Sequence, residues 1–343
     1  MKRTKILAVL FVGAFFVMLT LPGVTIAQAQ NVIKLTYASP YGPDHSFSKA
    51  DKRYFDKIEK DTKGRVKITP YWGGTLMTGA DAIDELAAGT ADMALISPSA
   101  AKAGYDLTKA SVLFFFGANQ QDGHKVFMET IKKIPELEKE FKGLKVLAWT
   151  GGADFQLLTR RPVRKIDDFK GLRIKARGDT GDVYTPFGVA TVPNPMGEVY
   201  MMIQKNMLDG VDAPISVLKV LKMADVTKYC TMLGTFGTPT GTRAMNINTY
   251  NKLPADIRKI FDDNVDYYSV IAEEEVQNDD KVGLEYAKAN GVEFINLPKA
   301  DLDKLRAVWY EKAQKEAKTL DAKGLPGTKF LNEAQAVIKK YAK

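Results

Sequence analysis

The chain of 343 residues has little of the chemistry that enzymes use, since it contains one cysteine and two histidines. A single cysteine excludes a disulfide within the chain, so the buried core must stabilise the fold, and a chain of this length can bury enough apolar surface. We expect Cys230 to be a buried strand residue. His45 and His124 are far apart in the sequence and form no spaced set with Cys230 for zinc or nucleophilic chemistry.

Motifs for catalysis and nucleotide binding are missing as well. The sequence has no HExxH, CxxC, GxSxG or Walker loop, which removes the residues for zinc, hydrolase and nucleotide sites. The glycine pairs at 73–74 and 151–152 follow predicted strands but lack the further glycines and the Lys-Ser/Thr ending of a phosphate loop. We therefore predict that the protein is not an enzyme and holds no metal and no cofactor.

Long apolar runs are absent beyond residue 30, and the one earlier run has the layout of a secretory signal peptide. Residues 2–5 include three basic side chains, and the apolar run Ile6–Leu21 follows them. Small residues at 27 and 29 predict cleavage after Ala29, and hence a periplasmic protein. A membrane anchor is the alternative, because the run approaches the roughly 20 residues that cross a bilayer core. A lipid anchor would need a cysteine at the start of the mature chain.

The formal charge of +8 falls to +5 once the three cations of the signal peptide are removed. The remaining basic residues are scattered among acids, without the clustered stripe and interleaved aromatic residues of a nucleic-acid groove. The excess of positive charge favours solubility and a modest attraction for anions. Because the charges are scattered, we expect no nucleic-acid partner.

The order of predicted elements is that of an α/β fold, in which strands and helices alternate. The first unit has predicted strands at 32–38, 66–71 and 93–96, with helices at 46–62 and 79–88 between them. The pattern restarts after Gly143 with strands at 144–150, 156–160 and 172–176. Two α/β units of similar size predict two lobes.

A long helix is predicted over residues 255–290, opened by proline and an acid at 254 and 256. At about 1.5 Å per residue it would span about 54 Å, more than one lobe of this size measures. The helix therefore either runs along both lobes or breaks near its one glycine, Gly283. Two Lys/Glu-rich helices at 300–320 and 333–342 are expected to pack on the outside.

Short motifs in order along the chain identify a family. They are Gly89–Asp92, Phe114–Phe116, Asp168–Lys175, Met196–Tyr200, Leu208–Pro214 and Asn251–Pro254. In order and spacing they closely resemble the solute-binding proteins of TRAP (tripartite ATP-independent periplasmic) transporters, over essentially the whole mature chain. The resemblance implies two α/β lobes that close on a ligand, hinge strands, a long helix crossing both lobes, and a permease of small and large membrane subunits.

The resemblance also implies where the lobes begin and end. After a signal peptide at 1–29, we expect the first lobe to comprise 30–152 and about 239–278. The second lobe would comprise 153–238 and about 279–300. Residues 301–343 would form the C-terminal helices.

Members of this family usually bind organic anions through an arginine at the end of the Gly-Leu-Lys-Ile-Arg strand, whose planar fork grips a carboxylate. Here that position is Lys175, which supplies charge without the fork. Arg177 stands two residues on and would face the same side if the strand continued. We hypothesise that Lys175 and Arg177 together hold an anionic group; the alternative is that both are exposed surface cations.

Further ligand-contacting residues are predicted from their places in the family pattern. Trp149, Phe155 and Phe236 would form apolar walls around an apolar or aromatic part of the ligand, unless they are plain core residues. The other predicted contacts are polar, namely Tyr37 and His45 near the first strand and turn, Ser97 and Ser99 after the third strand, and Asp212, which would meet a ligand amine or pair with Arg177. For His45 the alternative is a surface or helix-capping histidine.

The prediction is therefore an extracytoplasmic receptor that captures a small organic acid by hinge closure and delivers it to a TRAP permease. One alternative is a binding protein of an ATP-driven importer, which shares the topology but lacks the family motifs. An exported enzyme on a related fold and an input protein for a sensor kinase are further alternatives. The sequence names neither the ligand nor its chirality, and it leaves open the oligomeric state and whether a metal bridges the ligand.

Overall fold

The computed structural model describes residues 32–77, 79–118, 120–150, 153–192, 194–236 and 241–341. The predicted signal peptide lies outside these residues. Among the helices that this part of the chain forms, none combines the length and the apolar character needed to cross a membrane.

The first sheet has five strands in the order β2-β1-β3-β10-β4. Strand β1 is parallel to β2 and β3, whereas β10 is antiparallel to both β3 and β4. The strands are β1 (Ile33–Ala38), β2 (Val66–Tyr71), β3 (Met93–Ile96), β4 (Leu144–Thr150) and β10 (Gly241–Asn246). The helices of this part are α1 (Ser46–Asp61), α2 (Ala82–Ala88), α3 (Asp106–Phe114), α4 (Gln120–Ile131), α5 (Pro135–Lys139) and α9 (Ile247–Lys252).

The second sheet has six strands in the order β11-β9-β5-β8-β6-β7. Its strands are β5 (Asp154–Thr159), β6 (Arg173–Lys175), β7 (Ala190–Val192), β8 (Gly210–Pro214), β9 (Tyr229–Phe236) and β11 (Glu293–Asn296). Its helices are α6 (Gly178–Tyr184), α7 (Met196–Gln204) and α8 (Val217–Val220). The chain passes from the first sheet to the second between β4 and β5, and returns between β9 and β10. The predicted two-lobed α/β fold is confirmed, whereas the exact lobe boundaries stay a prediction.

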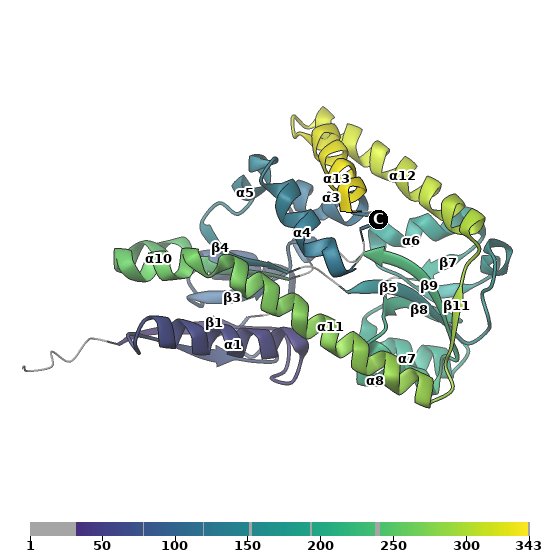
Figure 1. Cartoon of the computed structure of the whole chain (residues 1–343), viewed down its shortest axis with the longest axis horizontal. Coiled ribbons are helices and arrows are strands. Elements are labelled where there is room, and N and C mark those ends of the chain that lie inside the picture. Colours follow the sequence, from purple (N-terminus) through teal and green to yellow (C-terminus); the bar gives the residue numbers. More distant parts are fainter. Residues whose placement is uncertain are drawn as a thin grey trace, which may run out of the picture. The chain divides into compact units, whose positions relative to one another are not determined.

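The predicted long helix is divided into α10 (Ala255–Asp263) and α11 (Val265–Ala289). The break falls at Asn264, whose side chain donates to the carbonyl of Ile260 at 2.8 Å, and Gly283 lies inside the unbroken α11. Helix α11 runs past α1 and β4 of the first lobe to α8 of the second (Figure 1). The expected crossing of both lobes is therefore present, with the break at a different residue.

Gly283 allows α11 to approach the second lobe closely. A Cβ at this position would lie 2.7 Å from the Cα of Ser216 and 2.8 Å from the carbonyl oxygen of Ile215. The same contact is supported by Asp280, one turn earlier, which accepts a hydrogen bond from the backbone N–H of Ser216 at 2.9 Å. The glycine is needed for its small size, because both clashing atoms belong to backbone.

We expect Gly283→Ala to lower the free energy of unfolding by about 1–3 kcal/mol, because overpacking forces backbone to move. Urea denaturation of the two proteins measures the difference. Gly197→Ala on α7 is the matched control, because nothing lies within 4 Å of its added Cβ. An unchanged midpoint for Gly283→Ala would show that α11 is free to shift away from α8.

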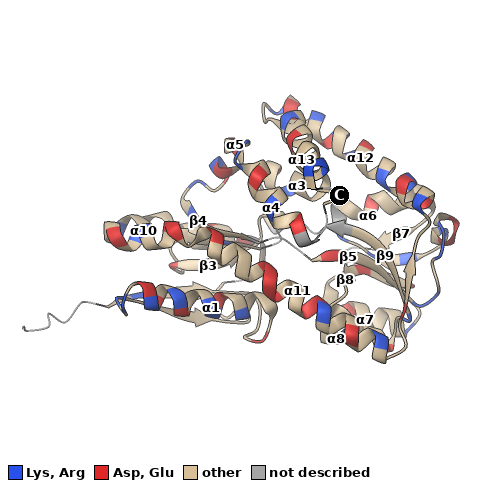
Figure 2. Ribbon diagram, in the orientation of Figure 1, with Lys and Arg blue, Asp and Glu red and all other residues tan. Residues whose placement is uncertain are grey.

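The C-terminal helices α12 (Lys299–Ala322) and α13 (Gly327–Tyr341) pack on α3 and α4. Buried residues recur along one face of α12 at three- and four-residue spacing. Among them, Trp309 stacks on Phe116 at 4.3 Å and donates its indole N–H to the carbonyl of Leu113 at 3.1 Å. The outer faces of α1, α11 and α12 carry interspersed basic and acidic residues (Figure 2).

Candidate functional site

Two of the predicted ligand residues, Arg177 and Phe155, contact each other. The guanidinium carbon of Arg177 lies 3.6 Å from the centroid of the Phe155 ring, which is the geometry of a stacked cation–π pair. Phe155 lies in β5, and Arg177 is the residue immediately before α6. Both side chains are half-buried.

Asp212 lies beside this pair and is almost completely buried, with 1% of its surface exposed. In the β5–β8 register Phe155 faces Pro214 and Leu157 faces Asp212. Residues two apart on a strand share a face, so Phe155 and Asp212 point to the same side of the sheet. Burial raises the pKa of the Asp212 carboxyl, whereas the charges of Arg177 and Lys175 act to lower it.

Lys175, the last residue of β6, is the third charged member of this group. Burial lowers the pKa of its ammonium group, the charge of Asp212 raises it, and the charge of Arg177 lowers it. The strand ends at Lys175, so the premise that strand alternation extends to Arg177 was wrong. The turn into α6 sets the direction of Arg177 instead. Lys175 pairs with Val211 in the β6–β8 register, so its side chain leaves the sheet on the face opposite Asp212, and the two groups interact only through their charges.

Tyr184, at the end of α6, is a member of the group that the sequence analysis missed. Its side chain is fully buried and stacks on Phe169, with ring centroids 6.2 Å apart. Burial raises the pKa of its hydroxyl well above the usual value, and the charge of Asp212 raises it further. No sequence motif marks this tyrosine, because α6 is a short helix whose packing alone brings it to Asp212.

The other two predicted apolar walls are not part of this group. Trp149 is 3% exposed and lies in the core, with its ring 5.0 Å from Phe141 and 5.5 Å from Phe127. This packing favours the core role that was the alternative for Trp149. Phe236 ends β9 opposite Asp154, but its side chain lies outside the described part of the structure, so its ligand contact stays a prediction.

Tyr37 belongs to a buried ion-pair cluster in the first lobe, formed by Tyr37, Asp51, Arg243 and Tyr268. Asp51 accepts hydrogen bonds from the hydroxyls of Tyr37 and Tyr268, each at 2.6 Å, and from Nε of Arg243 at 3.0 Å. The side chains of Arg243 and Asp51 are both 0% exposed. Sequence reasoning missed Asp51, Arg243 and Tyr268, because the sequence of β10, Gly-Thr-Arg-Ala-Met-Asn, does not mark Arg243 as a buried residue.

His45 is the N-cap of α1, as its alternative role predicted. Its Nδ1 accepts a hydrogen bond from the backbone N–H of Phe47 at 3.2 Å, and its ring stacks on Tyr41 at 4.1 Å. Burial lowers the pKa of His45 to about 4, although the charge of Asp279 acts to raise it. The imidazole is therefore neutral at pH 7, which suits a hydrogen-bond acceptor at a helix N-terminus.

Ser97 and Ser99 lie together after β3, with their hydroxyl oxygens 3.2 Å apart. Ser99 is exposed and Ser97 is half-buried. Their predicted contact with the ligand stays a prediction.

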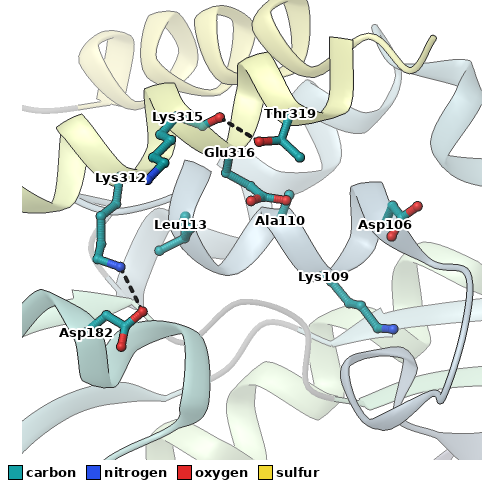
Figure 3. Close-up of a pocket in the computed structure, with 9 residues that line it drawn as sticks. All are labelled: Asp106, Lys109, Ala110, Leu113, Asp182, Lys312, Lys315, Glu316 and Thr319. Atoms are coloured by element: carbon teal, nitrogen blue, oxygen red, sulfur yellow. Dashed lines mark hydrogen bonds and ion pairs between the residues drawn. The ribbon is translucent and has the colours of Figure 1, made fainter. Parts of the chain in front are cut away.

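A separate pocket lies between α3, α6 and α12 (Figure 3). It contains none of the predicted ligand residues, and its charged lining is Lys109, Lys312, Lys315, Asp106, Asp182 and Glu316. Three cations face three acids, and Lys312 donates to Asp182 at 2.9 Å. This balance of charge favours helix packing over an anion site. Within the described residues no group of three or more His, Cys, Asp or Glu side chains has the arrangement of a metal site.

Comparison with known proteins identifies the family. Residues 38–319 match the model of the bacterial extracellular solute-binding proteins, family 7. The chain belongs to this family. The TRAP resemblance predicted from the short motifs is thereby confirmed, and with it the function of an extracytoplasmic solute-binding protein.

Curated and solved relatives agree with this assignment. The C4-dicarboxylate-binding periplasmic protein DctP of Rhodobacter capsulatus is 27% identical over 81% of this chain and 84% of its own length. A TRAP periplasmic solute-binding protein of Desulfovibrio salexigens, solved as an open complex, is 26% identical, with a TM-score of 0.82 over 90% of this chain and 97% of that chain. A TRAP solute-binding protein of Rhodoferax ferrireducens with copurified benzoate has the same fold, at 21% identity and a TM-score of 0.77 over 91% of this chain and 99% of that chain.

Proposed function

We propose that this chain captures a small organic acid through Arg177 and Lys175 and delivers it to a TRAP permease. The observation that carries the proposal is the stack of Arg177 on Phe155, 3.6 Å apart. A guanidinium donates its hydrogen bonds in its own plane, so a ring against its face fixes that plane without using the N–H edge. A carboxylate binds such an edge through two parallel hydrogen bonds.

The second cation adds charge without adding a fixed direction. Lys175 ends the strand next to β8 and interacts electrostatically with both Arg177 and Asp212. In a half-buried site the attraction between a cation and a carboxylate is stronger than in water. We therefore assign orientation of the ligand carboxylate to Arg177, and additional long-range attraction to Lys175.

The ligand would lie between two lobes whose closure follows from the fold. The chain crosses between the two sheets at β4–β5 and at β9–β10, and Phe155 is the second residue of β5, just after the first crossing. A ligand favours the closed form only if it binds that form more tightly than the open one. Contacts from both lobes at once would provide this difference in affinity. The relatives named above bind C4-dicarboxylates and benzoate, which supports a carboxylate as the ligand class.

The proposal includes the cellular setting. Export through a signal peptide cut after Ala29 would place the mature receptor in the periplasm, where TRAP permeases collect their solutes. Transport would then be driven by an ion gradient. Neither an ATP-driven importer nor an exported enzyme is favoured by the family match.

We expect Arg177→Ala to weaken carboxylate binding by at least about 100-fold, since hydrogen bonds to charged groups contribute about 1.5–3 kcal/mol each and Arg177 would make two of them. Lys175→Ala should weaken it about 10-fold, because only charge is lost. The test is a thermal-shift and calorimetric screen of the mature protein, from Gln30 onward, against mono- and dicarboxylates, amino acids and polyols. A native-state ligand raises stability by about 2.7 kcal/mol at one hundred times its dissociation constant.

Arg173→Ala is the matched control. Arg173 lies on β6, the strand that also carries Lys175, but its side chain is exposed and donates to the carbonyl of Asn206 at 2.7 Å. The dissociation constant of the Arg173→Ala variant for the carboxylate should change less than about twofold, because surface substitutions usually have small effects. Unchanged affinity in both Arg177→Ala and Lys175→Ala would contradict the proposed site. If only uncharged compounds raised the melting temperature in the screen, the proposal that the ligand is an organic acid would be wrong.

A further inference from the structure

Helix α11 is shared between the cores of the two lobes. Ala272 and Val276 pack in the core of the first lobe, whereas Ala287 packs in the core of the second. Between them, Asp280 accepts a hydrogen bond from the backbone of Ser216, just before α8, at 2.9 Å. The turn of α11 from Val276 to Asp280 therefore connects one lobe to the other, and a change in the angle between the lobes must displace its two ends relative to each other.

Two cavities lie along this part of α11. One, of about 370 Å³, is lined by Asp154, the first residue of β5, and by Gln277 and Asp280 of α11. The other, of about 210 Å³, is lined by Glu273 and Gln277 of α11 and by His124 of α4. Gln277 lines both cavities, so Glu273 and Asp154 lie to either side of it, one on the helix and the other on the strand that begins the second lobe.

The carboxyl group of Glu273 is buried with little to compensate a negative charge. The residue is 7% exposed, its Oε1 accepts one hydrogen bond from Gln277 at 3.1 Å, and its Oε2 has no hydrogen-bond partner within the described residues. The next two acids along the helix, Glu274 and Glu275, instead pair with Arg53 of α1 at 2.9 and 2.8 Å. A buried carboxylate without such partners is costly, which favours the protonated form.

The neighbouring elements add a negative charge and no paired cation. Their charged and titratable groups near this part of α11 are Lys49 and Arg53 of α1, Asp122, His124 and Lys125 of α4, and Asp154 of β5. Lys49 pairs with Asp279 at 3.2 Å, and Lys125 pairs with Asp122 at 3.6 Å. Burial lowers the pKa of His124, so its imidazole is neutral at pH 7. The charges that act on Glu273 are those of Asp154 and Asp280, and both are negative.

The repulsion between Asp154 and Glu273 depends on the angle between the lobes. Asp154 and Phe155 are adjacent on β5, so they point to opposite faces of the sheet. Phe155 contacts Arg177, whereas Asp154 lines the cavity beside α11. A rotation about β5 that closes the lobes on the Phe155 face moves Asp154 away from the part of α11 fixed to the first lobe. The larger separation weakens the repulsion between the two carboxylates.

We propose that Glu273 couples proton binding to lobe closure, with its carboxyl protonated in the open form and ionised in the closed form. Burial raises the pKa of this carboxyl to about 7, Gln277 opposes the rise, and the charges of Asp154 and Asp280 add to it. The proton is therefore exchanged near neutral pH. Because the closed form binds fewer protons, closure and solute binding are favoured as the pH rises. The inference goes beyond the proposed function; only its direction rests on it, through the choice of the Phe155 face as the ligand side.

The first experiment needs no ligand. Spin labels at Lys60→Cys on α1 and Gln204→Cys on α7, both exposed positions, report the distance between the lobes, and the native Cys230 is buried. We expect the distribution of distances in the mature protein to differ between pH 6 and pH 8, and Glu273→Gln to give the same distribution at both. Glu274→Gln, at an exposed neighbouring acid, should keep the difference. Identical distributions at the two pH values, or a difference that Glu273→Gln retains, would overturn the coupling.

The second experiment tests the direction by calorimetry with benzoate and pyruvate at pH 6 and pH 8, where both carboxyl groups are ionised throughout. We expect the affinity to rise about fivefold or more with pH, the lower end of the usual coupling between two sites, and Glu273→Gln to abolish the rise. A fall in affinity, or an equal rise in Glu273→Gln, would overturn the direction. If neither acid binds, that result counts against the proposed function, and the distance measurement still decides the coupling.

Discussion

Asp51→Asn lowers the free energy of unfolding by about 3–5 kcal/mol, because it removes the buried carboxylate that pairs with the buried guanidinium of Arg243. Nε of Arg243 lies 3.0 Å from the carboxylate of Asp51, and both side chains are fully buried. The hydroxyls of Tyr37 and Tyr268, at 2.6 Å, also lose a charged acceptor. Urea denaturation at neutral pH measures the change.

Arg53→Ala is the matched control on the same helix. Arg53 pairs with Glu274 and Glu275 at 2.9 and 2.8 Å, but its side chain is 41% exposed. An exposed pair contributes about 0–1 kcal/mol, so this variant should be close to the unaltered protein. A loss below about 1 kcal/mol for Asp51→Asn would mean that water or a shifted side chain compensates Arg243.

The Asp51 cluster also bears on how the two lobes move. It joins α1, β1, β10 and α11 through four side chains that are all buried. The N-terminal half of α11 is thereby fixed to the first lobe, whereas Gly283 lets its C-terminal half pack against the backbone before α8. Closure of the lobes must therefore bend α11 between these contacts or shift it at one of them.

The α/β fold could be predicted from the sequence because its elements are marked by local patterns. Apolar strands such as β3 and β4, and helices bounded by Pro and Gly, agree with the structure to within a few residues. The family motifs added the two-lobed arrangement and the solute-binding function, which no local pattern contains.

What escaped prediction depends on contacts between distant residues. Asp51 and Arg243 are separated by 192 positions, and nothing near either residue indicates its partner. The break at Asn264 was missed because asparagine is only a weak helix breaker, whereas glycine at 283 drew attention. Arg177 was grouped with Lys175 through strand alternation, although the strand ends at Lys175.

Glu273→Gln is expected to stabilise the protein at pH 8 by up to about 3 kcal/mol. Glu273 lies on α11 and is 7% exposed. Burial raises the pKa of its carboxyl to about 7, the side chain of Gln277 opposes this at 3.1 Å, and the charges of Asp154 and Asp280 raise it further. The unfolded value is 4.5, and each pKa unit corresponds to about 1.4 kcal/mol.

The sign follows from proton binding. Between pH 4.5 and about 7 the folded protein keeps a proton on Glu273 that the unfolded chain has lost, so stability falls as the pH rises through this window. Above pH 7 the full cost of a buried carboxylate is present, and glutamine removes it. The stability difference between variant and unaltered protein should therefore grow from pH 4.5 to pH 8 in urea titrations. Glu274→Gln is the control, because the side chain of Glu274 is 51% exposed, and it should show no such growth. A constant difference for Glu273→Gln across this range would rule out a titrating carboxyl at this position.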